Sequence, residues 1–366
     1  MRVPGPQRVA LIVALTVVAV GGLILLSNGA APGPWARVVA TSLCSLGSLG
    51  VVWMGLRGRL AEVAVIGVVL LLVPLFDLVA ALGSLGSPPT PQGAAFADTL
   101  AVPLAAAAGG PLLLPDTWLR AVVSRRWRLW TAVWVGAGLS LATLLAHTAI
   151  RPPLPPTWFV IAGAMAGSVV FACIGRRHLL LYQVGRQWVS LLVGVTFVTV
   201  AVIGVVGHGV GVPSHLALAA VVTDVALSFA AIVGMAVMAR RLRHIPDVLA
   251  PLVARDPLVV LALGLDPVVE EFVGRVGRKD AGTRDHIVRV GELAMRVAVR
   301  AGIRGRQLRA LGIGALLHDV GKLVVPDEVL RKPGALTSEE YEIVKRHASA
   351  GDELLTGSPA AMPSTP

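Results

Sequence analysis

The chain has 366 residues, of which 55% are hydrophobic and only 14% are charged. Soluble globular proteins carry about 25% charged residues, so this composition excludes an ordinary soluble protein and places most of the chain in lipid. The net charge of +11 belongs wholly to residues 1–244, where 16 Arg stand against five acidic residues, whereas residues 245–366 are balanced. A basic surplus confined to apolar sequence indicates membrane topology, and we expect no nucleic-acid partner.

Apolar stretches of membrane length recur up to residue 239. A helix needs about 20 apolar residues to cross a bilayer. The candidate spans are 9–28, 38–56, 61–83, 93–114, 128–150, 157–175, 188–207 and 215–238. The fourth is the weakest, because Pro103 and the run Gly109-Gly110-Pro111 interrupt it. We read the first as a retained helix, since it lacks a signal-peptide cleavage site, and we predict an eight-helix transmembrane region over residues 1–244.

The arginines are distributed unevenly between the two sides of this region. Fourteen lie on the ends and loops of one side, and only Arg37 and Arg151 lie on the other. Cytoplasmic loops carry the excess of Lys and Arg in membrane proteins. We therefore predict a multi-pass protein of the cell membrane, surrounded by the lipid bilayer, with both termini in the cytoplasm.

Two acidic residues, Asp77 and Asp224, fall inside predicted spans. A carboxylate in hydrocarbon costs about 2.5–3.5 kcal/mol on insertion scales, so such residues often have a function. A protonated carboxylate, or one paired with a neighbouring helix, is the alternative, and the sequence leaves both readings open. Cys44 and Cys173 also lie in apolar runs and form no metal or disulfide pattern.

Beyond the last span, the sequence becomes that of soluble helices. Residues 245–282, which are rich in proline, predict a connector of short helices, and residues 283–355 predict a bundle. The last segment, 356–366, has the composition of a disordered tail. No stretch has a convincing strand pattern, so the expected fold class is all-α.

Three amphipathic helices are expected in the bundle, over 284–303, 306–321 and 337–355. In the third, Thr337 and Glu340 form a capping-box pattern. In the first, Gly302 is a plausible end, and apolar residues recur at helical spacing. The residues of this predicted apolar face are Ile287, Val290, Leu293, Ala294 and Val297.

The bundle carries three histidines and an aspartate in a suggestive order: His286, then His318-Asp319, then His347. Imidazole and carboxylate together suit Fe, Mn, Zn and similar divalent metals, and ligands from separate helices can converge in a bundle core. A metal held in this way activates water for hydrolysis. Each histidine alone is more commonly a surface or core residue, and the order of the whole set is what favours a metal site.

Further motifs surround these residues. Arg289-Val290 follows His286, the central pair lies in 317-LHDVGK-322, and 326-PD-327 and 332-KPG-334 precede His347. Together with Leu330, Leu336, 339-EE-340 and Gly351, they resemble the HD superfamily of metal-dependent phosphohydrolases, and more narrowly its HD-GYP branch.

The resemblance implies a role for each matching residue. His286, His318, Asp319 and His347 match the family's metal ligands, with Asp319 bridging two metals, so one or two ions of Fe, Mn or a similar metal are expected. Lys322 matches the lysine that approaches the substrate phosphate, where its charge stabilises the developing anion. The family hydrolyses cyclic di-GMP, which makes a cyclic dinucleotide the expected substrate.

The sequence departs from the family pattern after Gly351. Further ligands and an Asp-Gly-x-Gly-Tyr-Pro motif follow there in the family and are absent from 352–366, while Gly282 stands where some members carry an extra acidic ligand. We therefore expect an incomplete HD-type bundle with at most two metals.

The expected function is a membrane-anchored phosphodiesterase. The alternatives are an inactive HD signalling or interaction module, a fragment of a longer phosphodiesterase, and a transporter with a degenerate appendage. A homodimer paired through the 245–278 connector is a further hypothesis.

Overall fold

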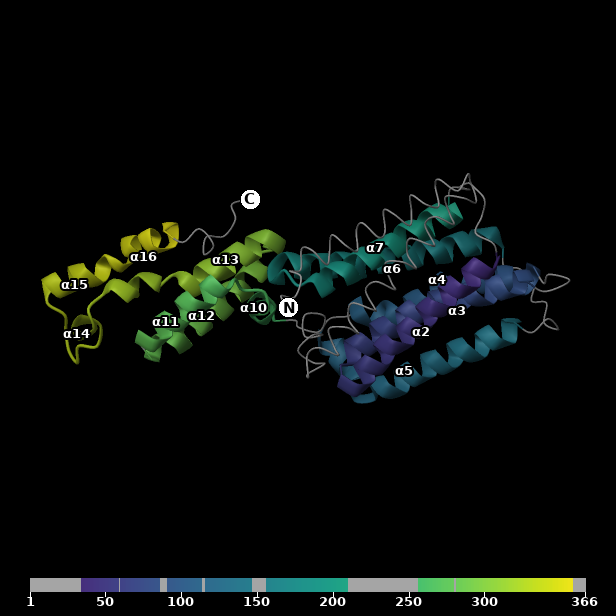
Figure 1. The fold of residues 1–366 in the computed structure, drawn as a ribbon, viewed down its shortest axis with the longest axis horizontal. Coiled ribbons are helices and arrows are strands. Elements are labelled where there is room, and N and C mark those ends of the chain that lie inside the picture. The colour runs from purple at the N-terminus through teal and green to yellow at the C-terminus, as the bar shows by residue number, and fades with distance from the viewer. Residues whose placement is uncertain are drawn as a thin grey trace. The chain divides into compact units, whose positions relative to one another are not determined.

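The structure is a computed structural model, and it describes residues 34–58, 60–85, 91–113, 116–146, 156–209, 256–279 and 281–357. Every regular element within these ranges is a helix (Figure 1), as predicted. The chain divides into two compact units. Unit 1 takes Met1–Leu179 and Trp188–Val253, and unit 2 takes Leu180–Gln187 and Ala254–Pro366.

Unit 1 is a bundle of long helices in which α3 is central. Helix α3 packs against α2, α4 and α5. The elements are α2 (Pro34–Gly58), α3 (Ala61–Leu85), α4 (Pro91–Gly109), the 3-10 turn η1 (Gly110–Leu113), α5 (Asp116–Ala146), α6 (Thr157–Gly185) and α7 (Trp188–Gly209).

Three helices of the described residues are long and apolar enough to cross a membrane: Ala61–Leu82, Arg126–Leu145 and Thr157–Gly185. They correspond to the third, fifth and sixth predicted spans. Helix α2 covers the second, and the fourth and seventh coincide with shorter apolar helices, Thr99–Leu113 and Val189–Val202. The first and eighth, 9–28 and 215–238, lie outside the described residues, as does Asp224. The count of eight therefore stays a prediction.

Small residues bring the helices of unit 1 close together. A Cβ atom on Gly67 of α3 would lie 2.6 Å from the backbone nitrogen of Val52 on α2. One on Gly175 of α6 would lie 3.0 Å from the backbone nitrogen of Val198 on α7. Close backbone approach at small residues is typical of helix packing in membranes.

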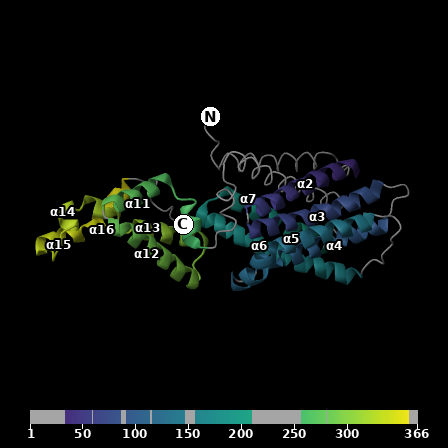
Figure 2. The same ribbon diagram turned by 90° about the horizontal axis from the view of Figure 1, so that it is seen from below.

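Unit 2 contains the shorter, amphipathic helices, and α12 and α13 lie side by side in both views of the chain (Figure 1, Figure 2). Its elements from residue 256 on are α10 (Pro257–Ala262), α11 (Pro267–Lys279), α12 (Ala281–Arg300), α13 (Gly305–Leu317), the 3-10 turn η2 (Val320–Val324), α14 (Asp327–Leu330), α15 (Ser338–Lys345) and α16 (His347–Thr356). Their core is built by Phe272, Ile287, Met295, Leu316 and similar side chains.

Local sequence explains where several of these helices begin. Asp256 and Asp266 each precede a proline, and the carboxylate of each accepts a hydrogen bond of 2.9 Å from the backbone two residues on. This is an N-cap followed by proline at the first helical position. The short helices expected in the connector are therefore present from residue 256 on. The predicted capping box is also confirmed, with Thr337 and Glu340 bonded to each other's backbone N–H.

Three details of the sequence prediction are wrong, and the first is that the helix expected over 306–321 ends at Leu317. The helix expected over 337–355 is two helices, α15 and α16, with Arg346 between them. On α12 the buried face runs through Ile287, Gly291, Met295 and Ala298, whereas Leu293 and Val297 are 65% and 57% exposed. The reason is that Gly291 lets the side chains of Leu316 and Leu258 approach the helix, and this small residue contributes no apolar signal to the periodicity.

Candidate metal centre

The candidate centre is built around Asp319, which follows the end of α13. The helix runs to Leu317, and Asp319 has non-helical backbone angles (φ −103°, ψ 11°) that turn the chain into η2. Leu317 and Val320 on either side are 4% and 2% exposed, so the turn is anchored in the core of unit 2. Asp319 is itself buried, with its side chain 8% exposed.

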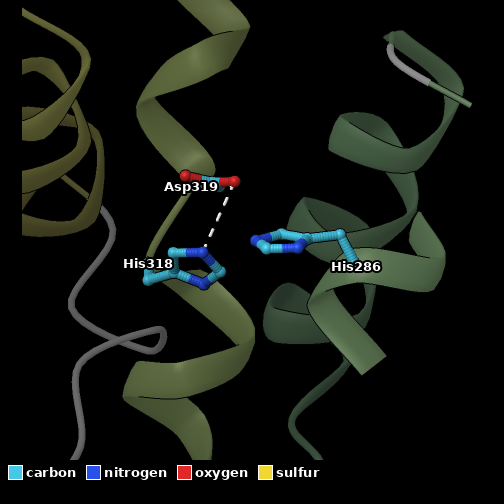
Figure 3. Close-up of side chains that lie close together, drawn as sticks. All are labelled: His286, His318 and Asp319. Carbon is cyan, nitrogen blue, oxygen red and sulfur yellow. Dashed lines mark ion pairs between the residues drawn. The ribbon is translucent and has the colours of Figure 1, made fainter. Parts of the chain in front are cut away.

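Two of the three predicted histidines converge on this carboxylate. His286 comes from α12 and His318 from the end of α13, and one ligand atom from each of His286, His318 and Asp319 lies within 4.8 Å of the others. Figure 3 shows the His286 ring pointing from its own helix toward His318 and Asp319. The two imidazole rings are 5.5 Å apart between centroids.

The third histidine lies at the edge of this group. His347 Nε2 is 3.8 Å from Asp319 Oδ1, and His347 is not one of the three residues that cluster. It is brought there by a close approach of α16 to η2, because a Cβ atom on Gly321 would overlap the His347 carbonyl oxygen and lie 2.7 Å from the backbone nitrogen of Gly351. Only glycine at position 321 permits this contact.

Backbone contacts orient the rings of His318 and His347. Nδ1 of His318 is 2.8 Å from the carbonyl oxygen of Ala315, and Nδ1 of His347 is 2.6 Å from that of Val344. A carbonyl oxygen only accepts, so each Nδ1 is the donor, and Nε2 of a neutral ring carries the lone pair. In both residues Nε2 is the atom that faces Asp319, at 3.4 Å for His318.

The charge of Asp319 is matched by Lys322, one turn along η2. Lys322 Nζ donates to Asp319 Oδ2 at 2.6 Å. The other oxygen, Oδ1, is the one nearer to His347. The predicted catalytic lysine is therefore in direct contact with the predicted bridging carboxylate.

These residues fit a divalent metal. The Asp319 carboxylate oxygen and Nε2 of His318 are 3.4 Å apart, and a carboxylate and a neutral imidazole both offer lone pairs that a cation between them can accept. A backbone carbonyl that accepts from Nδ1, as at His318 and His347, is a usual contact of a metal-binding histidine. The donor set of two or three imidazoles and one carboxylate suits Fe or Mn.

The comparisons with known proteins point to the same part of the chain. Residues 283–362 match the family model described as HD domain. That segment contains His286, His318, Asp319 and Lys322, and all eight significant curated relatives are named as phosphodiesterases of cyclic dinucleotides. The HD match and these relatives together support the HD-type phosphohydrolase family for the segment.

Three relatives illustrate the similarity. Cyclic di-GMP phosphodiesterase response regulator RpfG of Xanthomonas campestris is 42% identical over 92 residues, 24% of each chain. A cyclic di-GMP phosphodiesterase of Thermotoga maritima is 41% identical over 80 residues, 22% of each chain. The 3'3'-cGAMP-specific phosphodiesterase 1 of Vibrio cholerae is 38% identical over 74 residues, 20% of this chain and 17% of that protein. The chain thus spans about a quarter or less of the length of these relatives, and no solved structure gave a significant match.

One residue of α13 with buried contacts was not singled out from the sequence. Arg309 lies on α13, nine residues before His318, and its guanidinium donates to the carbonyl oxygens of Val184 and Gly264. In the sequence it is one of several arginines on an amphipathic helix, and nothing in its surroundings distinguishes it from the exposed Arg306.

Proposed function

We propose that the chain is a membrane-anchored, metal-dependent phosphodiesterase of the HD-GYP type that hydrolyses cyclic di-GMP. The observation that carries the proposal is the convergence of His286, His318 and Asp319 within 4.8 Å, inside the segment that matches the HD domain. The relatives named as cyclic di-GMP phosphodiesterases support the substrate class. The three helices long and apolar enough to cross a bilayer support the membrane anchor.

In this proposal His286, His318, Asp319 and His347 hold one or two ions of Fe, Mn or a similar metal. A divalent metal at such a site supplies Lewis-acid activation of water and of the phosphoryl oxygen. The protein's part is to fix the ligands: Asp319 from a turn anchored in the core, and His318 and His347 by their Nδ1–H contacts to backbone carbonyls.

Lys322 is placed to act on the substrate. Its ammonium, 2.6 Å from Asp319 Oδ2, would lie beside a phosphodiester bound at the centre and stabilise the negative charge that develops on phosphorus oxygens. In the reaction a bond forms between water oxygen and phosphorus, the bond from phosphorus to one ribose oxygen breaks, and that oxygen takes up a proton. The product is a linear dinucleotide.

A non-catalytic HD signalling module is the second candidate. The ion pair between Lys322 and Asp319 favours it, because an ammonium that neutralises the carboxylate can hold the turn together without a metal. In this case the segment would relay the state of the membrane region through protein contacts.

Hydrolysis by the full chain in lipid nanodiscs separates the two candidates. We expect Mn²⁺- or Fe²⁺-dependent cleavage of cyclic di-GMP, with 3'3'-cGAMP assayed in parallel. Asp319→Asn should reduce turnover by about 10³-fold or more, because metal activation supplies several kcal/mol and each 1.36 kcal/mol is tenfold in rate. The matched control is Asp352→Asn, which removes an exposed carboxylate on α16. This variant should retain activity. Metal-loaded wild-type protein that cleaves neither dinucleotide would favour the signalling module.

A further inference from the structure

The end of helix α6 is part of the core that holds the candidate metal centre. Unit 2 includes Leu180–Gln187, and within it Val184 is 5% exposed and Leu181 packs against the same cluster of apolar side chains. Helix α6 has 29 residues and is therefore about 43 Å long, longer than the roughly 30 Å of bilayer hydrocarbon. Its last turns are available to a soluble unit even when its apolar part spans a membrane.

Within unit 2, the end of α6 packs backbone to backbone against residues 260–264. A Cβ atom on Gly185 would lie 2.5 Å from the carbonyl oxygen of Val260 on α10, and one on Gly264 would overlap the backbone of Gly185. Gln187 Nε2 also donates to the carbonyl oxygen of Leu263. Helix α6 ends in a defined way, since Arg186 adopts a left-handed conformation (φ 52°) and its N–H donates to the Tyr182 carbonyl at 2.7 Å. This is the usual geometry of a helix C-terminus.

Arg309 joins this helix end to α13. Its Nη1 donates to Val184 O at 2.6 Å and its Nη2 to Gly264 O at 3.0 Å. Carbonyls in the last turn of a helix lack partners within the helix, and a cation there also complements the helix dipole. Burial lowers the pKa of the Arg309 guanidinium from its usual value, and nearby Arg186 adds to this, while Asp266 opposes it. A half-buried guanidinium with two carbonyl acceptors is a fixed contact rather than a solvated side chain.

Helix α13 connects this contact to the candidate ligands. Arg309 is nine residues, about two and a half turns, ahead of His318 on one continuous helix that ends at Leu317. His286 is on the neighbouring α12, so the position of α13 relative to α12 sets the spacing between His286 and the His318-Asp319 pair. A displacement at Arg309 therefore changes the geometry of the cluster.

We propose that Arg309 is a positioning residue that clamps the end of α6, residues 180–187, to α13, so that the position of α6 controls the metal affinity of the His286, His318 and Asp319 cluster. The proposal rests on the metal site of the proposed function and adds to it the segment of the membrane region through which it is regulated. Arg309 does not touch the cluster and acts through α13.

Mn²⁺ binding to the full chain in nanodiscs, followed by electron paramagnetic resonance well below the melting temperature, tests the clamp. We expect Arg309→Ala to weaken Mn²⁺ binding by about 2- to 30-fold, the range of coupling effects transmitted through packed elements, and Arg309→Lys to weaken it less. Gly185→Ala, which changes the seat of α6 and leaves α13 unaltered, should have the same effect in direction. The matched controls on α13 are Arg306→Ala, an exposed arginine, and Gly314→Ala, whose Cβ meets nothing within 4 Å; both should bind as the wild type does.

The Mn²⁺ affinity and the melting temperature together show whether Arg309 acts on the metal site or only on stability. A stability contact alone would lower the melting temperature and leave the Mn²⁺ affinity of the folded protein unchanged, so unchanged affinity in folded Arg309→Ala and Gly185→Ala proteins would overturn the clamp. If Arg309→Ala does not fold, Arg309→Lys and Gly185→Ala decide in its place. Asp319→Asn defines which binding belongs to the cluster. Wild-type protein that binds Mn²⁺ but cleaves no dinucleotide refutes the proposed activity and leaves the clamp to be judged on affinity, whereas absence of Mn²⁺ binding refutes both.

Discussion

The two sides of the candidate metal centre are held in different ways. On the α12 and α13 side, His286 precedes Ile287, which is 1% exposed, and Asp319 lies between Leu317 and Val320, which are 4% and 2% exposed. On the other side, α15 buries none of its residues and α16 buries only Gly351. The side that is anchored by apolar side chains brings its candidate ligands within 4.8 Å of one another, whereas His347 lies beside Asp319 alone.

The two sides indicate that burial of the flanking residues fixes the geometry of a ligand more firmly than a backbone contact does. Large buried side chains lock a helix in one position because interiors are close-packed. The contact at Gly321 and Gly351 brings α16 near η2 but supplies little apolar area. We therefore expect His286 and His318 to define the metal site and His347 to adjust it.

The strongest test of this comparison is the removal of one histidine from each side. His286→Ala should weaken Mn²⁺ binding by more than about 100-fold. His347→Ala should weaken it less, by about 10- to 100-fold, because its ligand atom lies outside the cluster of three. Mn²⁺ titration of the full chain gives both numbers under one set of conditions. Equal losses of Mn²⁺ affinity in the two variants would show that both sides hold the metal equally firmly, contrary to this expectation.

A substitution at the glycine contact tests the weaker side directly. Gly321→Ala forces η2 and α16 apart, because the new Cβ meets backbone atoms of His347 and Gly351 that cannot rotate away. We expect a loss of about 1–3 kcal/mol in the free energy of unfolding, as for overpacked sites, together with weaker Mn²⁺ binding through displacement of His347.

The control for this substitution is Gly314→Ala on α13, where the Cβ meets nothing within 4 Å. Alanine is favoured over glycine in a helix interior by up to about 1 kcal/mol, so this variant should be as stable as the wild type or more stable. Chemical denaturation followed by circular dichroism measures both. A Gly321→Ala protein with wild-type stability would mean that α16 is not held by this contact.

The helices of unit 2 were largely predictable because their ends carry local signals. The capping box at Thr337 and Glu340, the aspartate-proline pairs at 256 and 266, and Gly302 (φ 86°) each specify a backbone conformation within a few residues. The break at Arg346 carries no proline or glycine, and so it was not predicted. The buried face of α12 was missed because Gly291 is small, and its role depends on what approaches it.

In unit 1 the positions of the apolar helices could be predicted from the sequence, but their exact bounds and their packing could not: α6 was expected over 157–175 and runs over Thr157–Gly185. Helices such as α3 are apolar on almost every side, so no periodicity tells the buried face from the exposed one. Their contacts are decided by glycines such as Gly67 and Gly175, whose partners on α2 and α7 have no signature in the sequence.

The candidate centre was predictable only in part, for a similar reason. The order of His286, His318-Asp319 and His347 carries a resemblance, and the first three do converge. The contact of Arg309 with Val184 joins residues 125 positions apart and involves a backbone carbonyl, which every residue possesses. The contact therefore could not be predicted from the sequence, because any residue at position 184 would supply the same acceptor.

The smallest effect that we predict concerns the side of the candidate centre formed by α15 and α16, at the start of α15. The pKa of Glu340 is lowered from its usual 4.5, first by the hydrogen bond from Lys332, at 2.6 Å, and then by the backbone N–H of Thr337. A lowered pKa in the folded state means that the ionised carboxylate stabilises the fold above pH 4.5 and that this contribution is lost as the pH falls through the folded pKa.

Glu340→Gln, which keeps the capping box, should therefore lose less stability than the wild type between neutral pH and a pH below 4.5. The measurement is the melting temperature at both pH values, with the exposed Glu339→Gln as the control, which should behave as the wild type does. Because both side chains of the pair are partly exposed, at 33% and 25%, about 1 M salt should reduce the difference. A difference unchanged by salt would show that the contact is shielded from solvent.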